Sequence, residues 1–188
     1  ILLLVFQVSV QVATVAVPSI AKDLLGLSLN TAGIYILVPA GIGAILGIII
    51  LPKLIAKGWR KKKVIENSLI LVGVFLFLFT FIIPLFPYSF RVISTFFSFA
   101  ILGLSFVGVT IPSQTFLQES TPKELRGRVF GNFWFLVTVA SVLPVIFSGS
   151  IIEFLGIRIL LLIFSLLTIS AFYISKRFGD NFLNNGTT

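Results

Sequence analysis

The sequence has no cysteine, no histidine and no methionine in its 188 residues. Without cysteine, disulfide bonds and thiolate metal sites are excluded. Without histidine, the chain lacks the usual metal ligand and the usual carrier of protons near neutral pH. We therefore expect no bound metal and no cofactor. We also do not expect an enzyme, because there is no histidine, no cysteine and no paired carboxylate at membrane depth for acid–base or metal chemistry.

Charge is also scarce, since 11% of the residues are charged and 57% are hydrophobic, with a mean hydropathy of +1.15. A soluble domain is about one quarter charged and has too little interior to bury so much apolar surface. Lipid must therefore surround most of these side chains. The run LILVGVFLFLFTFIIPLF, residues 69–86, does not alternate between apolar and polar side chains, which argues against a membrane β-barrel and for helices.

Six segments come close to the roughly 20 apolar residues that a membrane-spanning helix needs. We predict an all-α membrane protein whose helices cover residues 1–20, 31–51, 64–86, 90–117, 129–152 and 159–175. The first segment is hydrophobic from its first residue and lacks the pattern of a signal peptide. We expect the chain to begin inside a helix of a longer protein.

Basic residues are distributed unequally between the connections. Eleven of the 14 Lys and Arg residues follow the second segment, follow the fourth segment or lie in the C-terminal tail; the other three are Lys22, Arg91 and Arg158. Cytoplasmic loops are enriched in Lys and Arg, so we predict a multi-pass protein of the cell membrane with a cytoplasmic C-terminus. This topology accounts for the net charge of +8, and we expect no nucleic-acid partner.

One charged segment, TPKELRGRVFG at residues 121–131, interrupts the apolar pattern. Thr121 and Glu124 have the spacing of a capping box, and Pro122 suits the first position of a helix. Gly127 and Gly131 are four residues apart, which puts them on one helix face and permits a close helix contact. Taken alone, the segment predicts only a helix start with topogenic charges.

The flanking stretches, PSQTFLQES at residues 112–120 and FGNFWFLVTVASVLPVIFSG at residues 130–149, extend this pattern. The whole region resembles the junction between the tenth and eleventh helices of the major facilitator superfamily, and looks most like bacterial macrolide- or drug-efflux members. The residues that carry the resemblance are Gln114 or Gln118, Pro122, Arg126, Gly127, Arg128 and Val129.

A second motif, GIIILPKLIAKGWRKKKVI at residues 47–65, is similar to the glycine-led basic loop of that family in its degenerate copy between helices 8 and 9. The matching residues are Gly47, Pro52, Lys53, Gly58, Arg60 and Lys61. The resemblance implies a cytoplasmic gating loop, although the acidic residue of the family motif is absent. GSIIEFLGIR, residues 149–158, is a weaker echo on the outer side, as inverted three-helix repeats would give.

The resemblance covers essentially the whole chain, residues 1–188, as helices 7–12 of a twelve-helix transporter. It implies two inverted three-helix repeats, a missing N-terminal six-helix half as the partner, and a small-molecule substrate moved by alternating access. It further implies efflux of amphipathic, drug-like compounds, in the manner of an antiporter. A non-catalytic six-helix membrane scaffold or partner subunit is the alternative.

Polar residues inside a membrane are costly unless they face a cavity or a partner. Gln7, Gln11 and Thr14 share one face of the first segment, because they are spaced by four and three residues. This face either borders a substrate cavity or forms interhelical hydrogen bonds, worth about 0.6 to 2 kcal/mol each. Asn132 and Gln114 are the other cavity candidates.

Three further expectations concern the remaining segments. The third and sixth segments are so uniformly apolar that we expect them to face lipid. Gly43 and Gly47 form a GxxxG pair, which predicts a tight contact or a moving interface. No charged residue lies at mid-depth, so a proton-coupling group is expected in the missing half, or at the cytoplasmic edge as Glu66 or Glu119.

Overall fold

The computed structural model describes residues 2–26, 28, 31 and 33–184, without the side chains at 2, 89 and 177–184. Its helices are α1 (Leu2–Ser19), α3 (Val38–Ala56), α4 (Lys61–Phe81), α5 (Tyr88–Glu119), α6 (Arg126–Leu155) and α7 (Ile157–Asn184). Short turns η1 (Ile20–Leu24), η2 (Gly33–Leu37), η3 (Ile83–Leu85) and η4 (Lys123–Leu125) extend or join them. Residues 1 and 32, which belong to predicted helices, lie outside the described residues.

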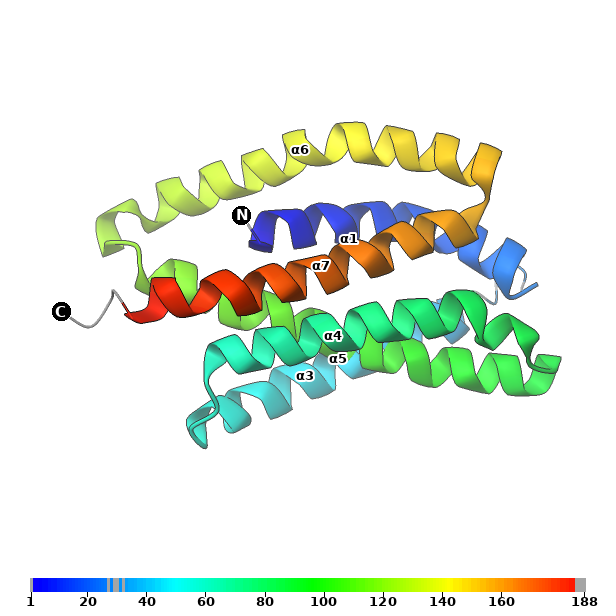
Figure 1. Cartoon of the computed structure of the whole chain (residues 1–188), viewed down its shortest axis with the longest axis horizontal. Helices are drawn as coiled ribbons and strands as arrows, with labels where there is room; N and C mark the ends of the chain where they lie inside the picture. The colour runs from blue at the N-terminus through cyan, green and yellow to red at the C-terminus, as the bar shows by residue number, and fades with distance from the viewer. Residues whose placement is uncertain (1, 27, 29–30, 32, 185–188) are drawn as a thin grey trace.

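Six helical stretches of the described chain are long and apolar enough to cross a membrane. They cover residues 3–24, 33–56, 61–85, 90–119, 123–155 and 157–176. Figure 1 shows the long helices running along one common axis. The predicted fold class, an all-α protein with six membrane-spanning helices, is therefore confirmed for the described residues.

Two helix boundaries differ from the prediction. α4 ends at Phe81 rather than near residue 86, and a short 3₁₀ turn follows it. Pro84 lies in that turn, and a proline cannot donate a helical hydrogen bond and disfavours the α conformation of the residue before it. α7 runs to Asn184, well past the predicted end at residue 175, because a helix can continue after its hydropathy no longer suits a membrane.

The predicted capping box at the start of α6 is wrong. The Thr121 hydroxyl donates to the carbonyl of Leu117 at 2.7 Å, which lies in the last turn of α5. Pro122 precedes the turn η4 with an extended backbone, and no side chain caps that turn. Thr121 therefore closes the preceding helix and does not open the next one, because the i−4 carbonyl at a helix end is itself an unsatisfied acceptor.

The helices pack in a series in which each lies against the next, in the order α3, α5, α4, α7, α6 and α1. The second span thus pairs with the fourth, the fifth pairs with the first, and the third pairs with the sixth. Exchanging the first three spans with the last three leaves these pairings unchanged. These three pairings fit two three-helix units related by a pseudo-two-fold axis, whereas the α5–α4 contact has only a much weaker counterpart between α1 and α7.

The weak sequence echo has a counterpart at equivalent ends of these two units. Gly58 follows α3 with φ of +95°, and Gly156 follows α6 with φ of +83°. An arginine stands two residues after each glycine, at Arg60 and Arg158. A positive φ is accessible to glycine at little cost, so both glycines end a helix and redirect the chain in the same way.

The closest helix contact is between α3 and α5. A Cβ atom built on Gly43 would lie 1.8 Å from the carbonyl oxygen of Ala100, and one built on Gly103 would lie 2.0 Å from that of Ala40. Each helix therefore places a backbone carbonyl over a glycine of the other. The predicted GxxxG pair is in tight contact, since Gly47 also meets Val107 and Leu104 of α5.

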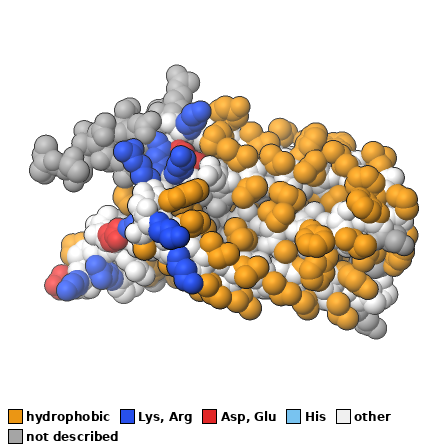
Figure 2. All heavy atoms as spheres, turned by 90° about the horizontal axis from the view of Figure 1, so that it is seen from below, with side chains coloured by type: hydrophobic (Ala, Val, Ile, Leu, Met, Phe, Trp, Pro, Cys, Tyr) orange, Lys and Arg blue, Asp and Glu red, His pale blue; other side chains and the backbone are white. Residues whose placement is uncertain are grey.

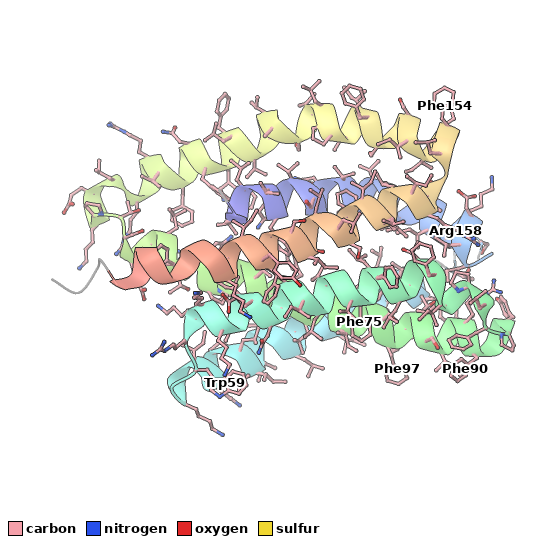
Figure 3. All side chains as sticks on the ribbon, in the orientation of Figure 1. Trp59, Phe75, Phe90, Phe97, Phe154 and Arg158 are labelled. Atoms are coloured by element: carbon pink, nitrogen blue, oxygen red, sulfur yellow. The ribbon has the colours of Figure 1, made fainter. Side chains whose placement is uncertain are left out.

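Charge and apolar surface are separated along the bundle. Figure 2 shows Lys and Arg side chains gathered at one end, while hydrophobic side chains are spread over the rest of the face in that view. We call this the basic end; it contains the α3–α4 connection, the α5–α6 connection and Lys176. Large aromatic side chains such as Phe97 and Phe154, 63% and 82% exposed, project outward (Figure 3), as lipid-facing residues do.

Candidate substrate cavity

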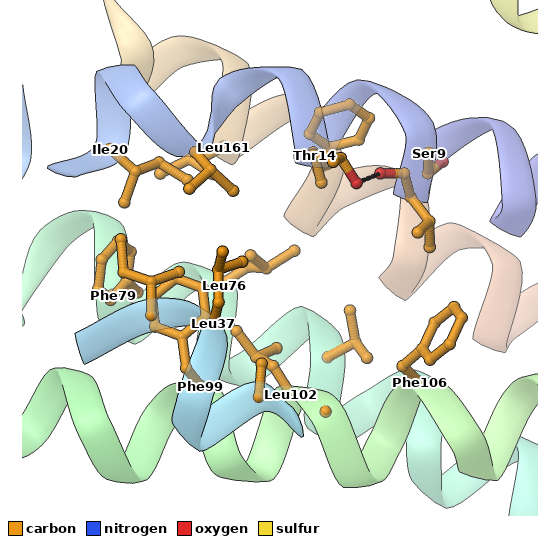
Figure 4. A pocket seen from close by; sticks show the side chains of 18 of the residues that line it. Ser9, Thr14, Ile20, Leu37, Leu76, Phe79, Phe99, Leu102, Phe106 and Leu161 are labelled. Atoms are coloured by element: carbon orange, nitrogen blue, oxygen red, sulfur yellow. Dashed lines mark hydrogen bonds between the residues drawn. The ribbon is translucent and has the colours of Figure 1, made fainter. Parts of the chain in front are cut away.

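A cavity of about 400 Å³ lies inside the helix bundle, open on one side. Its walls come from α1, η2 with α3, α4, α5 and α7, and Figure 4 shows its lining side chains at close range. On α3, α4, α5 and α7 the lining residues fall in the half of the span away from the basic end, or near its middle, whereas on the first span they run from Phe6 to Ile20. Pockets of this volume fit small organic molecules.

The cavity lining is almost entirely apolar. No Lys, Arg, Asp or Glu side chain is among the described lining residues, and the polar side chains are Ser9, Thr14 and Thr168. Each of these hydroxyls donates to the backbone carbonyl four residues earlier in its own helix, at 2.9, 2.9 and 3.0 Å respectively. Such bonds satisfy the hydroxyl hydrogen locally, so it is not free for a ligand.

Aromatic and aliphatic side chains pack at both ends of the cavity. Toward the basic end, Phe6 of α1 stacks on Phe106 of α5, with ring centroids 5.9 Å apart. Toward the other end, Ile20, Ile36 and Phe79 belong to the largest buried hydrophobic cluster of the protein. Packed hydrophobic side chains therefore line both ends of the cavity.

The open side of the cavity lies between α1 and the η2–α3 segment. Three lining residues are exposed, namely Thr14 on α1, Leu37 in η2 and Gly41 on α3. These two segments stand at the two ends of the packing series, with no tight helix pairing such as that of α3 with α5. We call this opening the mouth, with one lip on α1 and the other on η2 and α3.

Of the five predicted cavity residues, only Thr14 is part of the lining. Gln11 and Asn132 are exposed and Gln114 is half-buried. Gln7 is 6% exposed, yet it makes no side-chain hydrogen bond within the described part of the chain. A role for these four side chains in a pathway shared with another set of helices stays a prediction.

Sequence reasoning missed the contribution of α4 and α7, which were expected to face only lipid. Leu76 and Phe79 of α4 and Leu161 and Phe164 of α7 line the cavity, and Phe79 is fully buried. The opposite faces of both helices are exposed. The small polar residues of these helices could have indicated that α4 and α7 face each other. The Ser165 hydroxyl of α7 donates to the carbonyl of Gly73 in α4 at 2.9 Å and holds the two helices together.

The basic end brings the two sequence motifs together. Lys61, at the start of α4, forms an ion pair with Glu119, at the end of α5, with Nζ and Oε2 2.6 Å apart. Arg126 donates from Nε to the backbone carbonyl of Thr121 at 3.2 Å and so ties the α5–α6 connection to the start of α6. This ion pair joins two spans that are adjacent in the packing series.

Most of the other predicted motif residues lie on the surface of the described chain. Gly47 is buried against α5, whereas seven are exposed on the described chain: Pro52, Lys53, Gly58, Arg60, Gln118, Pro122 and Arg128. Gly127 is also exposed, and a Cβ built on it or on Gly131 would meet no described atom within 4 Å. The expected close contact at these two glycines therefore does not occur inside this chain.

The comparisons with known proteins agree with this architecture. The model of the Major Facilitator Superfamily matches residues 1–145, more than three quarters of the chain. The chain belongs to this superfamily, a family of membrane transporters and not of enzymes, and it is a multi-pass membrane protein.

One relative is similar over a short stretch. An uncharacterised MFS-type transporter of Bacillus subtilis (strain 168), YfiS, is 36% identical over 67 residues. The match covers 36% of this chain and 16% of that protein. No solved structure matches the chain.

Proposed function

We propose that this chain forms the C-terminal six-helix half of a twelve-helix transporter that moves small molecules across the membrane by alternating access. The observation that carries the proposal is the open apolar cavity between α1 and α3, inside a six-helix unit with pseudo-two-fold pairing. In transporters built from repeats, the substrate site lies near the middle of the membrane where the two repeats meet. The mouth would then face the N-terminal half.

Efflux of amphipathic, drug-like compounds is the activity we favour. The apolar lining supports it, since such compounds bury most of their surface in hydrophobic pockets. The resemblance of residues 112–149 to macrolide- and drug-efflux members supports it further. For proton antiport, we place the coupling group outside residues 1–188, because no carboxylate is among the described residues that line the cavity.

The transport proposal is tested with the full-length protein in a bacterial strain that lacks its main drug exporters. Accumulation of several small, uncharged fluorescent amphipathic dyes is measured with and without expression. We expect lower accumulation on expression, and restored accumulation for Ala44→Phe, which places a large ring in the lining. Unchanged accumulation of every compound, with normal membrane levels of the protein, would contradict drug efflux.

We also propose that the basic end faces the cytoplasm of a bacterial cell, so that the C-terminus is cytoplasmic. The gathering of Lys and Arg at one end supports this orientation. Single cysteines at Ser28 and at Lys63, in a cysteine-free full-length protein, are labelled with a membrane-impermeant maleimide. Ser28→Cys should react in intact cells and Lys63→Cys only after permeabilisation. The reverse pattern would overturn the orientation.

A further inference from the structure

The chemistry of the cavity lining restricts what it can hold. Its described side chains carry no charge, and the hydroxyl hydrogens of its three polar residues are used by their own helices. A charged group moved from water into such surroundings loses its hydration and gains no partner. An ammonium or carboxylate group would therefore be excluded from this part of the protein, whereas hydrocarbon would be accepted.

The shape of the cavity adds a second restriction. The Phe6–Phe106 stack lines it toward the basic end, and the buried cluster around Phe79 lines it toward the other end. The mouth between Thr14 and Gly41 is consequently the open side. The exposed lining residues therefore favour entry from the side of the bundle, through this mouth, at the level where the proposed N-terminal half would adjoin it.

We propose that the cavity is a binding site for an uncharged, hydrocarbon-rich ligand that enters through the mouth between α1 and α3. This inference rests on the proposed transport function and names the substrate class of the same site. The ligand is a neutral lipophilic compound or the acyl chain of a lipid, since both present the same apolar surface to the lining. A permanent cation is not held here.

Gly41 offers a direct test of the proposal. It lies on one lip of the mouth, and a Cβ built on it would meet no atom within 4 Å, so Gly41→Phe can block the mouth without disturbing the helix packing. Thr14→Phe blocks it from the opposite lip. Ile42→Phe is the matched control, because the neighbouring residue is 43% exposed and is not part of the lining.

The experiment measures thermal stabilisation of the purified full-length protein by two probes, the neutral dye N-phenyl-1-naphthylamine and the cation tetraphenylphosphonium. We expect the neutral dye to raise the Tm of the wild type and of Ile42→Phe in a saturable way. In Gly41→Phe and Thr14→Phe its apparent affinity should fall at least about tenfold. Partition of the dye into detergent is the same for all variants and cancels in the comparison.

Two results would overturn the proposal. The first is equal stabilisation of Gly41→Phe and the wild type by the neutral dye. The second is saturable binding of tetraphenylphosphonium that both mouth variants abolish, because a cation would then occupy the cavity. Neither result depends on transport. The proposed ligand class can therefore be wrong while drug efflux in cells is confirmed, and it can be right while drug efflux is contradicted.

The two sources of the ligand are distinguished on the same samples. Lipids extracted from the purified wild type, Ile42→Phe and Gly41→Phe are quantified by mass spectrometry. A phospholipid that co-purifies in equal molar amount with the first two and is lost from Gly41→Phe identifies an acyl chain as the occupant. Equal lipid content in all three, together with loss of dye binding in Gly41→Phe, identifies the neutral compound.

Discussion

At Gly43 the backbones of α3 and α5 meet with no room for a side chain. A Cβ on Gly43 would lie 1.8 Å from the carbonyl oxygen of Ala100, whereas ordinary contacts begin at 3.4 Å. Gly43→Ala therefore requires the helices to separate by about 1.6 Å, because a backbone carbonyl cannot swing aside as a side chain can. Overpacking typically costs 1–3 kcal/mol, and we expect roughly 2–3 kcal/mol here because backbone meets backbone.

Gly41→Ala is the matched control for this prediction. Gly41 is two residues earlier in the same helix, and the space around its Cβ position is open. Alanine is favoured over glycine inside a helix by roughly 1 kcal/mol, so this change should leave the free energy of unfolding unchanged or raise it. The two alanine variants of α3 are thus predicted to shift stability in opposite directions.

The reciprocal glycine provides a second control. Gly103→Ala meets the carbonyl of Ala40 and should cost about as much as Gly43→Ala. Once the helices have separated for one methyl group, much of the space for the other exists, so the double variant should cost less than the sum of the single variants. The free energies come from reversible unfolding of the full-length protein in SDS. Equal effects of Gly41→Ala and Gly43→Ala, or strictly additive costs at Gly43 and Gly103, would refute this reasoning.

Other predictions concern individual side chains. Lys61→Ala breaks the ion pair with Glu119, in which the two side chains are 34% and 59% exposed. The free energy of unfolding should therefore fall by less than about 1 kcal/mol, and by less still in high salt. A large, salt-independent loss of stability in thermal unfolding would contradict this. Arg126→Ala should lower turnover in a transport assay and leave substrate affinity nearly unchanged; lost binding at normal protein levels would disprove it. Gln11→Leu should alter the range of exported compounds at unchanged Tm. Gln7→Leu replaces a side chain that makes no hydrogen bond within the described chain by an apolar one, so it should leave stability unchanged or raise it. The opposite pattern in the same two assays would show that Gln7 borders the pathway.

The fold was predictable from the sequence because a membrane imposes a length and a composition on each span. The ends of spans were less predictable, since they depend on single residues. Pro84 stops α4 early, and Thr121 closes α5 instead of capping α6. The spacing of Thr121 and Glu124 is the same whether Thr121 caps α6 or closes α5, so only the backbone conformation decides which helix the Thr121 hydroxyl bonds to.

Most residues of the cavity lining could not be predicted from the sequence, for a physical reason. In lipid, a residue that faces the membrane and one that faces an apolar cavity have the same hydropathy, as Leu76 and Phe77 of α4 illustrate. Only polar residues could indicate the cavity from the sequence. They correctly predicted Thr14 as a lining residue, but they also predicted Gln7, which is buried outside the lining. Gly43 was identifiable from its spacing, whereas its partner helix, α5, was known only from the packing.

The unequal tightness of the helix contacts indicates which part of the bundle can move during transport. α3 and α5 are locked by reciprocal carbonyl–glycine contacts, whereas α1 meets α5 through a stacked aromatic pair, an interaction worth only about 0.5–1.5 kcal/mol beyond its buried area. Changes in the width of the mouth should therefore come from α1, moving together with α6, against which it packs. Thr14→Cys and Gly41→Cys, joined by bismaleimides of increasing length in the full-length protein, should arrest transport with the short linker and restore it with the long one. Thr14→Cys alone and Gly41→Cys alone should keep full transport under the same treatment, because neither offers a second cysteine to cross-link. Full transport with the shortest cross-link in place would mean that the mouth does not move, and that alternating access leaves this half of the transporter rigid.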